Sequence, residues 1–274
     1  MCIVAIAWQL FDELPLILLS NRDEFLQRPT EPLHQWTDKP IFAGRDEQSG
    51  GTWLGIHQEI QPYHHQNGRW VAVLNFRDGA QASDNERSRG ELVTDFLTSH
   101  LSPMAFAHQI NLLDYGGFNL IIGDTQQAVI VNNRGHAPTP LYAGLHVFSN
   151  GQPEDSWFKT ERLRSRLRQE VLPLISENSA FEYWQDAAFA ALSDTTKAPI
   201  DKLPKTGLDI AIEQALSSIY IEPIALSNIE TTMPTYGTRT QSILTVSYDS
   251  KSINLSEKYH LQLNSREYQH TQHE

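Results

Sequence analysis

The chain has 274 residues, and 21 Lys and Arg against 33 Asp and Glu give it a formal net charge of −12. A chain of this length buries a core without disulfides or a structural metal, and its 40% apolar content excludes the low-complexity and disordered classes. The acidic balance repels a phosphate backbone, and no basic run interleaved with aromatic residues compensates for it. We therefore expect no nucleic-acid partner.

The chain contains 1 cysteine, which excludes an internal disulfide framework and every multi-cysteine metal site. Its first eight residues are apolar but have no basic segment before them, so we expect no signal peptide. No apolar run approaches the roughly 20 residues that span a bilayer. We expect a soluble cytoplasmic protein without an integral membrane segment, and the sequence leaves its oligomeric state open.

The first two strands are predicted in residues 2–8 and 16–19. Residues 2–8 are apolar at both even and odd positions, which is typical of a strand that is buried on both faces. The short polar stretch between the two runs predicts an antiparallel hairpin centred near residue 12, in which the numbers of paired residues sum to about 24. On that register, residues 21–24 return to lie beside Cys2.

The remaining elements alternate between short strands and grouped helices, which predicts an α+β fold of two packed sheets with helices on their outer faces. We expect helices over residues 87–99, 103–113, 180–192 and 208–218, and another that begins after Asp155 as its N-cap. Strands are expected at 40–43, 53–56, 70–75, 118–123, 128–132, 146–149, 241–248 and 253–263. Residues 1–274 are predicted to form a single domain, with a frayed tail after about residue 264.

Cys2 is the first candidate for chemistry. Removal of Met1 would place a thiol and an α-amine on one residue, and an α-amine with a pKa of about 7.7 to 8.0 can accept the thiol proton near neutral pH. A retained Met1 would block this mechanism. The other interpretation is a small buried hydrophobic residue that begins a core strand.

The tetrapeptide Asn21-Arg22-Asp23-Glu24 is the second candidate, because the hairpin register brings it to Cys2. There, a guanidinium would stabilise a thiolate and a carboxylate would hold an α-ammonium. The other interpretation is an ordinary polar turn with a surface ion pair.

Several ordered motifs carry a resemblance to a known family. They are Met1-Cys2-Ile3, Asn21-Arg22-Asp23-Glu24, Gly44-Arg45-Asp46, Gly50-Gly51-Thr52-Trp53-Leu54-Gly55, Leu74-Asn75-Phe76-Arg77, Ser88-Arg89-Gly90, Gly116-Gly117-Phe118-Asn119-Leu120, Ser149-Asn150-Gly151 and Tyr236-Gly237-Thr238-Arg239. On these motifs, nearly the whole chain resembles the NRDE family, also called the Transport and Golgi Organization protein 2 family.

The resemblance implies a four-layer αββα sandwich similar to the N-terminal-nucleophile (Ntn) hydrolases. In that superfamily a nucleophilic cysteine is assisted by an arginine, an aspartate, two asparagines and a late arginine. The resemblance places these catalytic roles here on Cys2, Arg22, Asp23, Asn75, Asn150 and Arg239. Ligand-binding residues would be Asn21, Glu24, Arg45, Trp53, Arg77, Asn119, Tyr236 and Thr238.

The segment between Gly55 and Val71 departs from the family pattern, because it is longer and richer in histidine than the resemblance leads us to expect. His64 and His65 are weak candidates for axial ligands of haem iron. Adjacent histidines in a solvated loop are the other interpretation. No C-x-x-C-H motif is present, so covalent haem attachment is not expected.

Three functions follow from these expectations. The first is non-covalent binding and trafficking of haem or a similar small amphipathic ligand, with which the resembled family is associated; no cofactor would be required. The second is hydrolysis of a linear non-peptide amide, with Cys2 as the nucleophile. The third is binding of acyl-CoA, whose phosphates would meet Arg22, Arg45, Arg77 or Arg239.

Overall fold

The antiparallel hairpin at the start of the chain has the predicted register. β1 (Cys2–Trp8) pairs with β2 (Leu16–Phe25), with Cys2 opposite Arg22 and Trp8 opposite Leu16, so that every pair of residue numbers sums to 24. In this computed structural model the described residues are 2–58, 68–79, 85–177, 179–225, 235–252 and 258–268. β2 runs further than the predicted strand and includes residues 21–24, which therefore lie beside Cys2 as expected.

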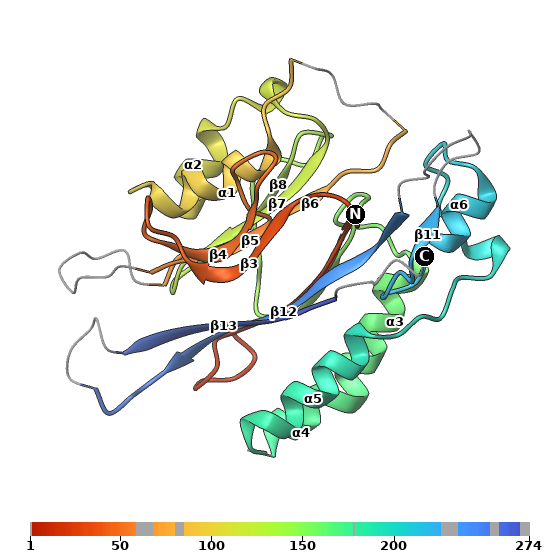
Figure 1. Ribbon diagram of the computed structural model, residues 1–274. Coiled ribbons are helices and arrows are strands. Elements are labelled where there is room, and N and C mark those ends of the chain that lie inside the picture. The colour runs from red at the N-terminus through yellow and green to blue at the C-terminus, as the bar shows by residue number, and fades with distance from the viewer. Residues whose placement is uncertain are drawn as a thin grey trace.

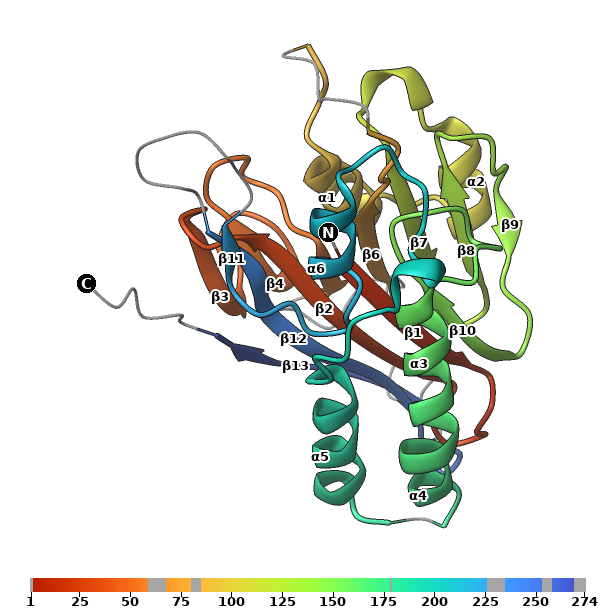
Figure 2. The same ribbon diagram turned by 90° about the vertical axis from the view of Figure 1, so that its right-hand side faces the viewer.

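The hairpin belongs to the first of two antiparallel sheets, whose strand order is β10-β1-β2-β12-β11, with β13 also paired to β12. Figure 2 shows β1, β2, β12 and β13 running side by side. The further strands of this sheet are β10 (Gly144–Phe148), β11 (Ile224–Ala225), β12 (Thr235–Tyr248) and β13 (Tyr259–Glu267).

The second sheet has its strands in sequence order from β3 to β9, each antiparallel to the next. This order places β6, which ends at Asn75, in the centre of the sheet. The strands are β3 (Thr30–Gln35), β4 (Ile41–Asp46), β5 (Leu54–His57), β6 (Trp70–Asn75), β7 (Phe118–Gly123), β8 (Ala128–Asn132) and β9 (Thr139–Pro140).

Helices cover the outer face of each sheet (Figure 1). α1 (Arg89–Thr98) and α2 (Pro103–Gln109) lie on the second sheet, and the turn η1 (Leu112–Asp114) follows them. The first sheet is covered by α3 (Phe158–Arg166), the π-helical turn η2 (Leu167–Val171), α4 (Leu172–Ser176) and α5 (Phe181–Leu192). The shorter η3 (Ile200–Lys202) and α6 (Ile210–Ala215) follow α5.

Three hydrophobic cores separate these layers. Cys2, Val4 and Ile6 belong to the core between the two sheets, whereas Ile3 and Ala5 belong to the core under α3 to α5. A third core fills the space between the second sheet and helices α1 and α2. β1 is thus buried on both faces, as the apolar residues at its even and odd positions predict. The order of layers is αββα.

Some element boundaries differ from the sequence predictions. The helix predicted to start at Asp155 begins instead at Phe158 after Trp157, because the Asp155 carboxylate accepts a hydrogen bond from the Gln152 backbone at 2.7 Å. The sequence prediction missed β3, β9 and β11. β12 also starts six residues earlier than predicted, where its pairing with the longer β2 begins.

β13 continues to Glu267, which pairs with Thr240, and residues 269–274 lie outside the described residues. The single-domain assignment stays a prediction. Among the described residues, no helix combines the length and the apolar character needed to cross a membrane.

Candidate functional site

A cavity of about 410 Å³ opens where the first sheet, the second sheet and the N-terminus of α1 meet. Cys2 begins β1 at its wall, and Asn75 ends β6 on the other side. The lining residues are Cys2, Arg22, Asp23, Glu24, Arg28, Asp46, Gln48, Ser49, Thr52, Trp53, Val73, Asn75, Glu86, Arg87, Ser88, Arg89, Gly90 and Gly116.

Cys2 lies in the wall of this cavity and is 9% exposed as a residue. Burial and the Asp23 charge raise the pKa of the Cys2 thiol above its ordinary value, while the Asp23 backbone hydrogen bond and the Arg22 charge act in the opposite direction. Since the net shift is upward, the thiol is protonated at neutral pH. Any nucleophilic role would therefore require a group that takes its proton.

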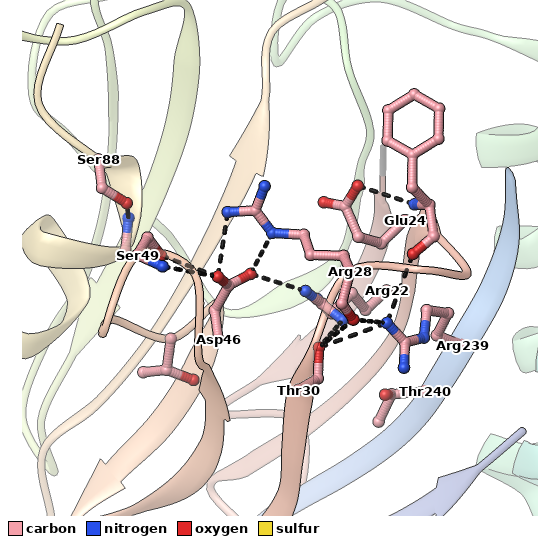
Figure 3. Close-up of polar contacts among 12 residues, drawn as sticks. Arg22, Glu24, Arg28, Thr30, Asp46, Ser49, Ser88, Arg239 and Thr240 are labelled. Carbon is pink, nitrogen blue, oxygen red and sulfur yellow. Dashed lines mark hydrogen bonds and ion pairs between the residues drawn. The ribbon is translucent and has the colours of Figure 1, made fainter. Parts of the chain in front are cut away.

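Two arginines of the cavity wall, Arg22 and Arg28, share the Asp46 carboxylate (Figure 3). Arg28 binds both oxygens of Asp46, with Nε to Oδ2 at 2.5 Å and Nη2 to Oδ1 at 3.0 Å, and Arg22 donates to Oδ2 at 3.0 Å. Arg22 also stacks 4.1 Å from the ring centre of Trp53. Burial raises the pKa of Asp46, but the hydrogen bonds and charge of Arg28 outweigh this and lower it. Asp46 is therefore ionised and balances one of the two positive charges, and the Glu24 charge also acts on Arg28.

α1 brings a third arginine to the cavity. Ser88 caps the helix in a reciprocal capping box with Glu91, and Arg89 is its first residue. The Arg89 Nη1 donates to the Gly117 carbonyl at 3.1 Å, and burial lowers its pKa. A Cβ at Gly51 would lie 2.6 Å from the Gly90 carbonyl carbon, so this close backbone approach fixes the start of α1 against the cavity rim.

Two further predicted residues complete the wall near Cys2. Asp23 accepts a hydrogen bond from Thr238 Oγ1 at 2.6 Å, and burial raises its pKa to about 6. The backbone carbonyl of Asn75 accepts from Asn150 Nδ2 at 2.8 Å, which positions the end of β6. Asn75 itself lines the cavity.

Six of the predicted residues thus meet at one cavity: Cys2, Arg22, Asp23, Glu24, Trp53 and Asn75. The other predicted residues do not line it. They fall into two groups, polar residues that connect buried backbone segments and arginines that bind elsewhere.

Asn21 has the clearest structural role in the first group. Its Nδ2 donates to the carbonyls of Leu192 and Ile219, both at 2.8 Å, and so ties β2 to the end of α5. It lies opposite Ile3, whose side chain belongs to the helix-covered core. Assignment of Asn21 to ligand binding is therefore not supported by its position.

Asn119 and Asn150 also have their amides committed to the fold. Asn119 donates to the carbonyls of Ser149 and Gly151 at 3.2 and 2.8 Å, and Asn150 donates to Asn75 as described above. Asn150 is 0% exposed. Its side chain therefore orients the strand that carries Asn75 and does not reach the cavity.

Tyr236 and Thr238 support Asp23 from β12. The Tyr236 hydroxyl donates to the Asp23 carbonyl at 2.7 Å, and Thr238 binds its carboxylate. Burial raises the pKa of Tyr236 well above its ordinary value, so its hydroxyl stays protonated and donates. Both residues hold Asp23 in place and do not themselves line the cavity.

The remaining predicted arginines bind outside the cavity. Arg45 forms a two-bond ion pair with Asp38 at 3.0 and 3.1 Å. Arg77 pairs with the buried Glu213 at 3.2 Å. Arg239, which the resemblance placed in the catalytic set, donates to the carbonyls of Phe25 and Arg28 and to Thr30 Oγ1, and so secures the turn after β2 (Figure 3).

Sequence reasoning missed Arg28, Asp46, Arg89 and the buried Lys159. Asp46 and Arg89 stand in motifs that carry the family resemblance, and that membership was the available signal. Arg28 and Lys159 stand in no such motif. Only the tertiary structure brings Arg28 to Asp46 and buries Lys159 to 2% exposure.

Among the described residues, no group of three or more His, Cys, Asp and Glu side chains is arranged to hold a metal ion. His64 and His65, the two weak candidates for haem ligands, lie outside the described residues.

Comparison with known proteins identifies the family. The family model described as Transport and Golgi organisation 2 matches residues 1–262. The chain belongs to the Transport and Golgi organisation 2 family. It is 32% identical over 248 residues to the Homo sapiens Transport and Golgi organization protein 2 homolog, with 85% of this chain and 83% of that protein covered.

Other members of the Transport and Golgi organisation 2 family are similarly related. The Mus musculus homolog is 31% identical over 245 residues, with 84% of this chain and 82% of that protein covered.

Among solved structures, a Caenorhabditis elegans N-acylethanolamine-hydrolyzing acid amidase ortholog shares 14% identity at a TM-score of 0.43 over 70% of this chain and 86% of that one. The two sheets and three cores described above define the four layers independently of that likeness.

Proposed function

We propose that this protein binds a small anionic amphipathic ligand in the Cys2 cavity and carries it. Haem is the first candidate ligand and acyl-CoA the second. The observation that supports this function is a group of three arginines in the cavity wall, Arg22, Arg28 and Arg89, called the arginine wall below. Asp46 forms ion pairs with Arg22 and Arg28 and balances one of their two charges.

The cavity has a size and chemistry suited to the anionic end of such a ligand. About 410 Å³ lies within the usual range for small-molecule sites. Guanidinium groups bind carboxylates and phosphates through paired hydrogen bonds, and Trp53 and Val73 offer apolar contact. Glu24 and Glu86 also line the cavity, so the anionic group is expected at the arginine wall and the apolar body near Trp53.

A titration with haemin tests this function. Wild-type protein is expected to shift the Soret band with a stoichiometric end point, and Arg89→Met is expected to weaken binding by about tenfold to a hundredfold, because a charged hydrogen bond contributes roughly 1.5 to 3 kcal/mol. Haemin dimethyl ester, which lacks the propionate charges, is expected to bind more weakly than haemin. Its affinity should be the same for wild type and for Arg89→Met. Palmitoyl-CoA is titrated in parallel to decide between the two ligands.

The matched control is Arg164→Met, which removes an arginine that pairs with Glu161 on the surface of α3. It is expected to bind like wild type. Equal affinity for haemin and its dimethyl ester would contradict an arginine-held anion, and failure of both haemin and palmitoyl-CoA to bind would contradict the proposed function.

The position of Cys2 favours a second candidate function, hydrolysis of a linear amide. Its thiolate would add to the amide carbonyl, the amine would leave with a proton, and water would cleave the resulting thioester. Asn75 lines the same cavity, and its side-chain amide could donate to the developing oxyanion.

Intact mass and turnover test this second function together. An active hydrolase is expected to have lost Met1 and to release amine from a long-chain acyl amide, whereas Cys2→Ala is expected to show only background hydrolysis. A mature protein that keeps Met1 and does not turn over acyl amides would contradict it.

A further inference from the structure

An apolar hollow of about 340 Å³, called the α1–α2 groove below, lies between α1 and α2. Its lining has five apolar members, of which two are buried and three are half-buried, and five polar ones. An apolar hollow with a polar rim is typical of a binding surface. The lining residues are Leu92, Leu101, Phe106, Ile110 and Tyr115, with Arg87, Asp95, Ser99, Gln109 and Asn111.

The α1–α2 groove begins where the Cys2 cavity ends. Arg87 lines both of them. A second segment also runs from one to the other, because Gly116 lines the cavity and Tyr115 lines the groove. The two segments are joined at this point, since the Arg87 backbone N–H donates to the Asp114 carbonyl at 2.8 Å and Arg87 forms a β-bridge with Tyr115. One molecule can therefore lie in both the cavity and the groove.

α1 gives the groove its direction. Its first residues, Arg89 and Gly90, line the cavity. The groove is lined further along the helix by Leu92, Asp95 and Ser99, whose spacing of three and four residues corresponds to one helix face. At 1.5 Å per residue, this stretch is about 10 Å long. A groove along one helix face suits a flexible linear chain better than a broad planar ring system.

Arg87, at the boundary, has its charge balanced locally. Its guanidinium donates to Glu91 Oε2 at 2.8 and 3.0 Å and to Asp95 Oδ2 at 3.4 Å. It also lies 5.0 Å from the ring centre of Tyr115. Two carboxylates thus surround one guanidinium, so the groove side of this boundary does not attract an anion. An anionic group is favoured at the arginine wall, and the groove offers apolar contact.

We propose that the α1–α2 groove holds the linear acyl chain of a ligand whose anionic end lies at the arginine wall. This inference rests on the proposed function for the anionic end. Trp53 contacts the part of the chain nearest that end, and the remainder continues past Arg87 along α1. Of the two candidate ligands, the acyl compound has such a chain and haem does not.

Linear saturated carboxylates from butyrate to dodecanoate test the groove. Titration calorimetry below the micelle concentration measures each dissociation constant. Wild-type affinity is expected to rise about two- to fourfold for each added methylene that leaves water. CoA thioesters of the same chain lengths form a second arm, which distinguishes a free carboxylate from a head group that carries phosphates.

Ile110→Glu places a carboxylate in the groove and is expected to remove most of the rise with chain length, while butyrate binds as it does to wild type. The matched control is Ile210→Glu, which makes the same change at an exposed position of α6 outside the groove and should keep the wild-type rise. Arg89→Met is expected to weaken every member of the series by a similar factor and to leave the rise per methylene unchanged.

Wild-type affinity that does not depend on chain length would overturn the inference, as would equal rises for Ile110→Glu and Ile210→Glu. A concentration-dependent wild-type dimer that Ile110→Glu dissociates would also overturn it, because a second copy would then occupy the groove. If Ile110→Glu does not fold, Gln109→Trp, which adds bulk at the groove rim, is compared with His108→Trp, the neighbouring exposed position outside the groove.

The same series separates the groove from the proposed function. A rise that Ile110→Glu removes, together with no effect of Arg89→Met on any member, would support the groove and contradict the arginine wall. If no member of either arm binds, the inference is overturned, and the haemin titration still tests the proposed function.

Discussion

Asp46→Ala is expected to destabilise the protein by about 3 to 5 kcal/mol, because it leaves two guanidiniums in the wall of the cavity without their shared carboxylate. Arg22 is largely buried, at 5% side-chain exposure, and contacts Asp46 at 3.0 Å. Arg28 binds both carboxylate oxygens. Urea unfolding followed by circular dichroism measures the loss.

The stability that Asp46 contributes should depend on pH in a definite direction. Arg28 and Arg22 hold the pKa of Asp46 below its ordinary value. Its stabilisation is therefore present above the unfolded pKa of about 3.9 and disappears as the pH falls through the lower folded pKa. The free-energy difference between wild type and Asp46→Ala should be constant near neutral pH and shrink toward zero in acid.

Asp38→Ala is the matched control, since Asp38 also makes a two-bond pair with an arginine but is 46% exposed at its side chain. It is expected to cost no more than about 1 kcal/mol. A similar cost for the two substitutions would show that the burial of Asp46 does not matter and would contradict the expected role.

The register of the first hairpin could be predicted because it depends on local information. Two apolar runs and a short polar connection leave one pairing that keeps both apolar faces buried. The same argument placed Arg22 beside Cys2, as the structure has it. Short strands such as β9 and β11 were missed, since two residues carry no periodicity.

The site was predicted less completely, because motif membership does not say which face a side chain occupies. Alternation along β2 places Arg22 on the same face as Cys2, between the sheets, and Asn21 on the face of Ile3, under the helices. Applied to the whole tetrapeptide, this period of two separates Asn21 from Arg22 and Glu24, but it does not account for Asp23, which has the parity of Asn21 and still lines the cavity. Strand alternation was thus an available signal that the sequence analysis did not use.

Arg239 and Lys159 could not be assigned by any local pattern. Arg239 lies at an irregularity of register between Thr238 and Thr240, where alternation along β12 breaks. Lys159 follows an aromatic residue at the start of a helix and is ordinary in sequence. Its burial depends on how α3 packs against the first sheet, which is tertiary information.

Glu213→Ala is expected to destabilise the protein about as much as Asp46→Ala does, by about 3 to 5 kcal/mol, for a related reason. Arg77 and Glu213 are 5% and 4% exposed at their side chains and pair at 3.2 Å, and Thr206 Oγ1 also donates to Glu213. Without Glu213, the Arg77 charge would remain buried. Burial already lowers the pKa of Arg77, and the Glu213 charge offsets that effect.

A double substitution separates the burial of a charge from the loss of packing. Arg77→Met with Glu213→Leu removes both charges while keeping side-chain volume, so it should recover most of the stability that Glu213→Ala loses. Glu161→Ala, which breaks an exposed pair on α3, should change the free energy of unfolding by less than about 1 kcal/mol. If the double variant is no more stable than Glu213→Ala in urea, the cost lies in the geometry that the ion pair imposes between α6 and the end of β6, and the explanation by an unpaired charge is wrong.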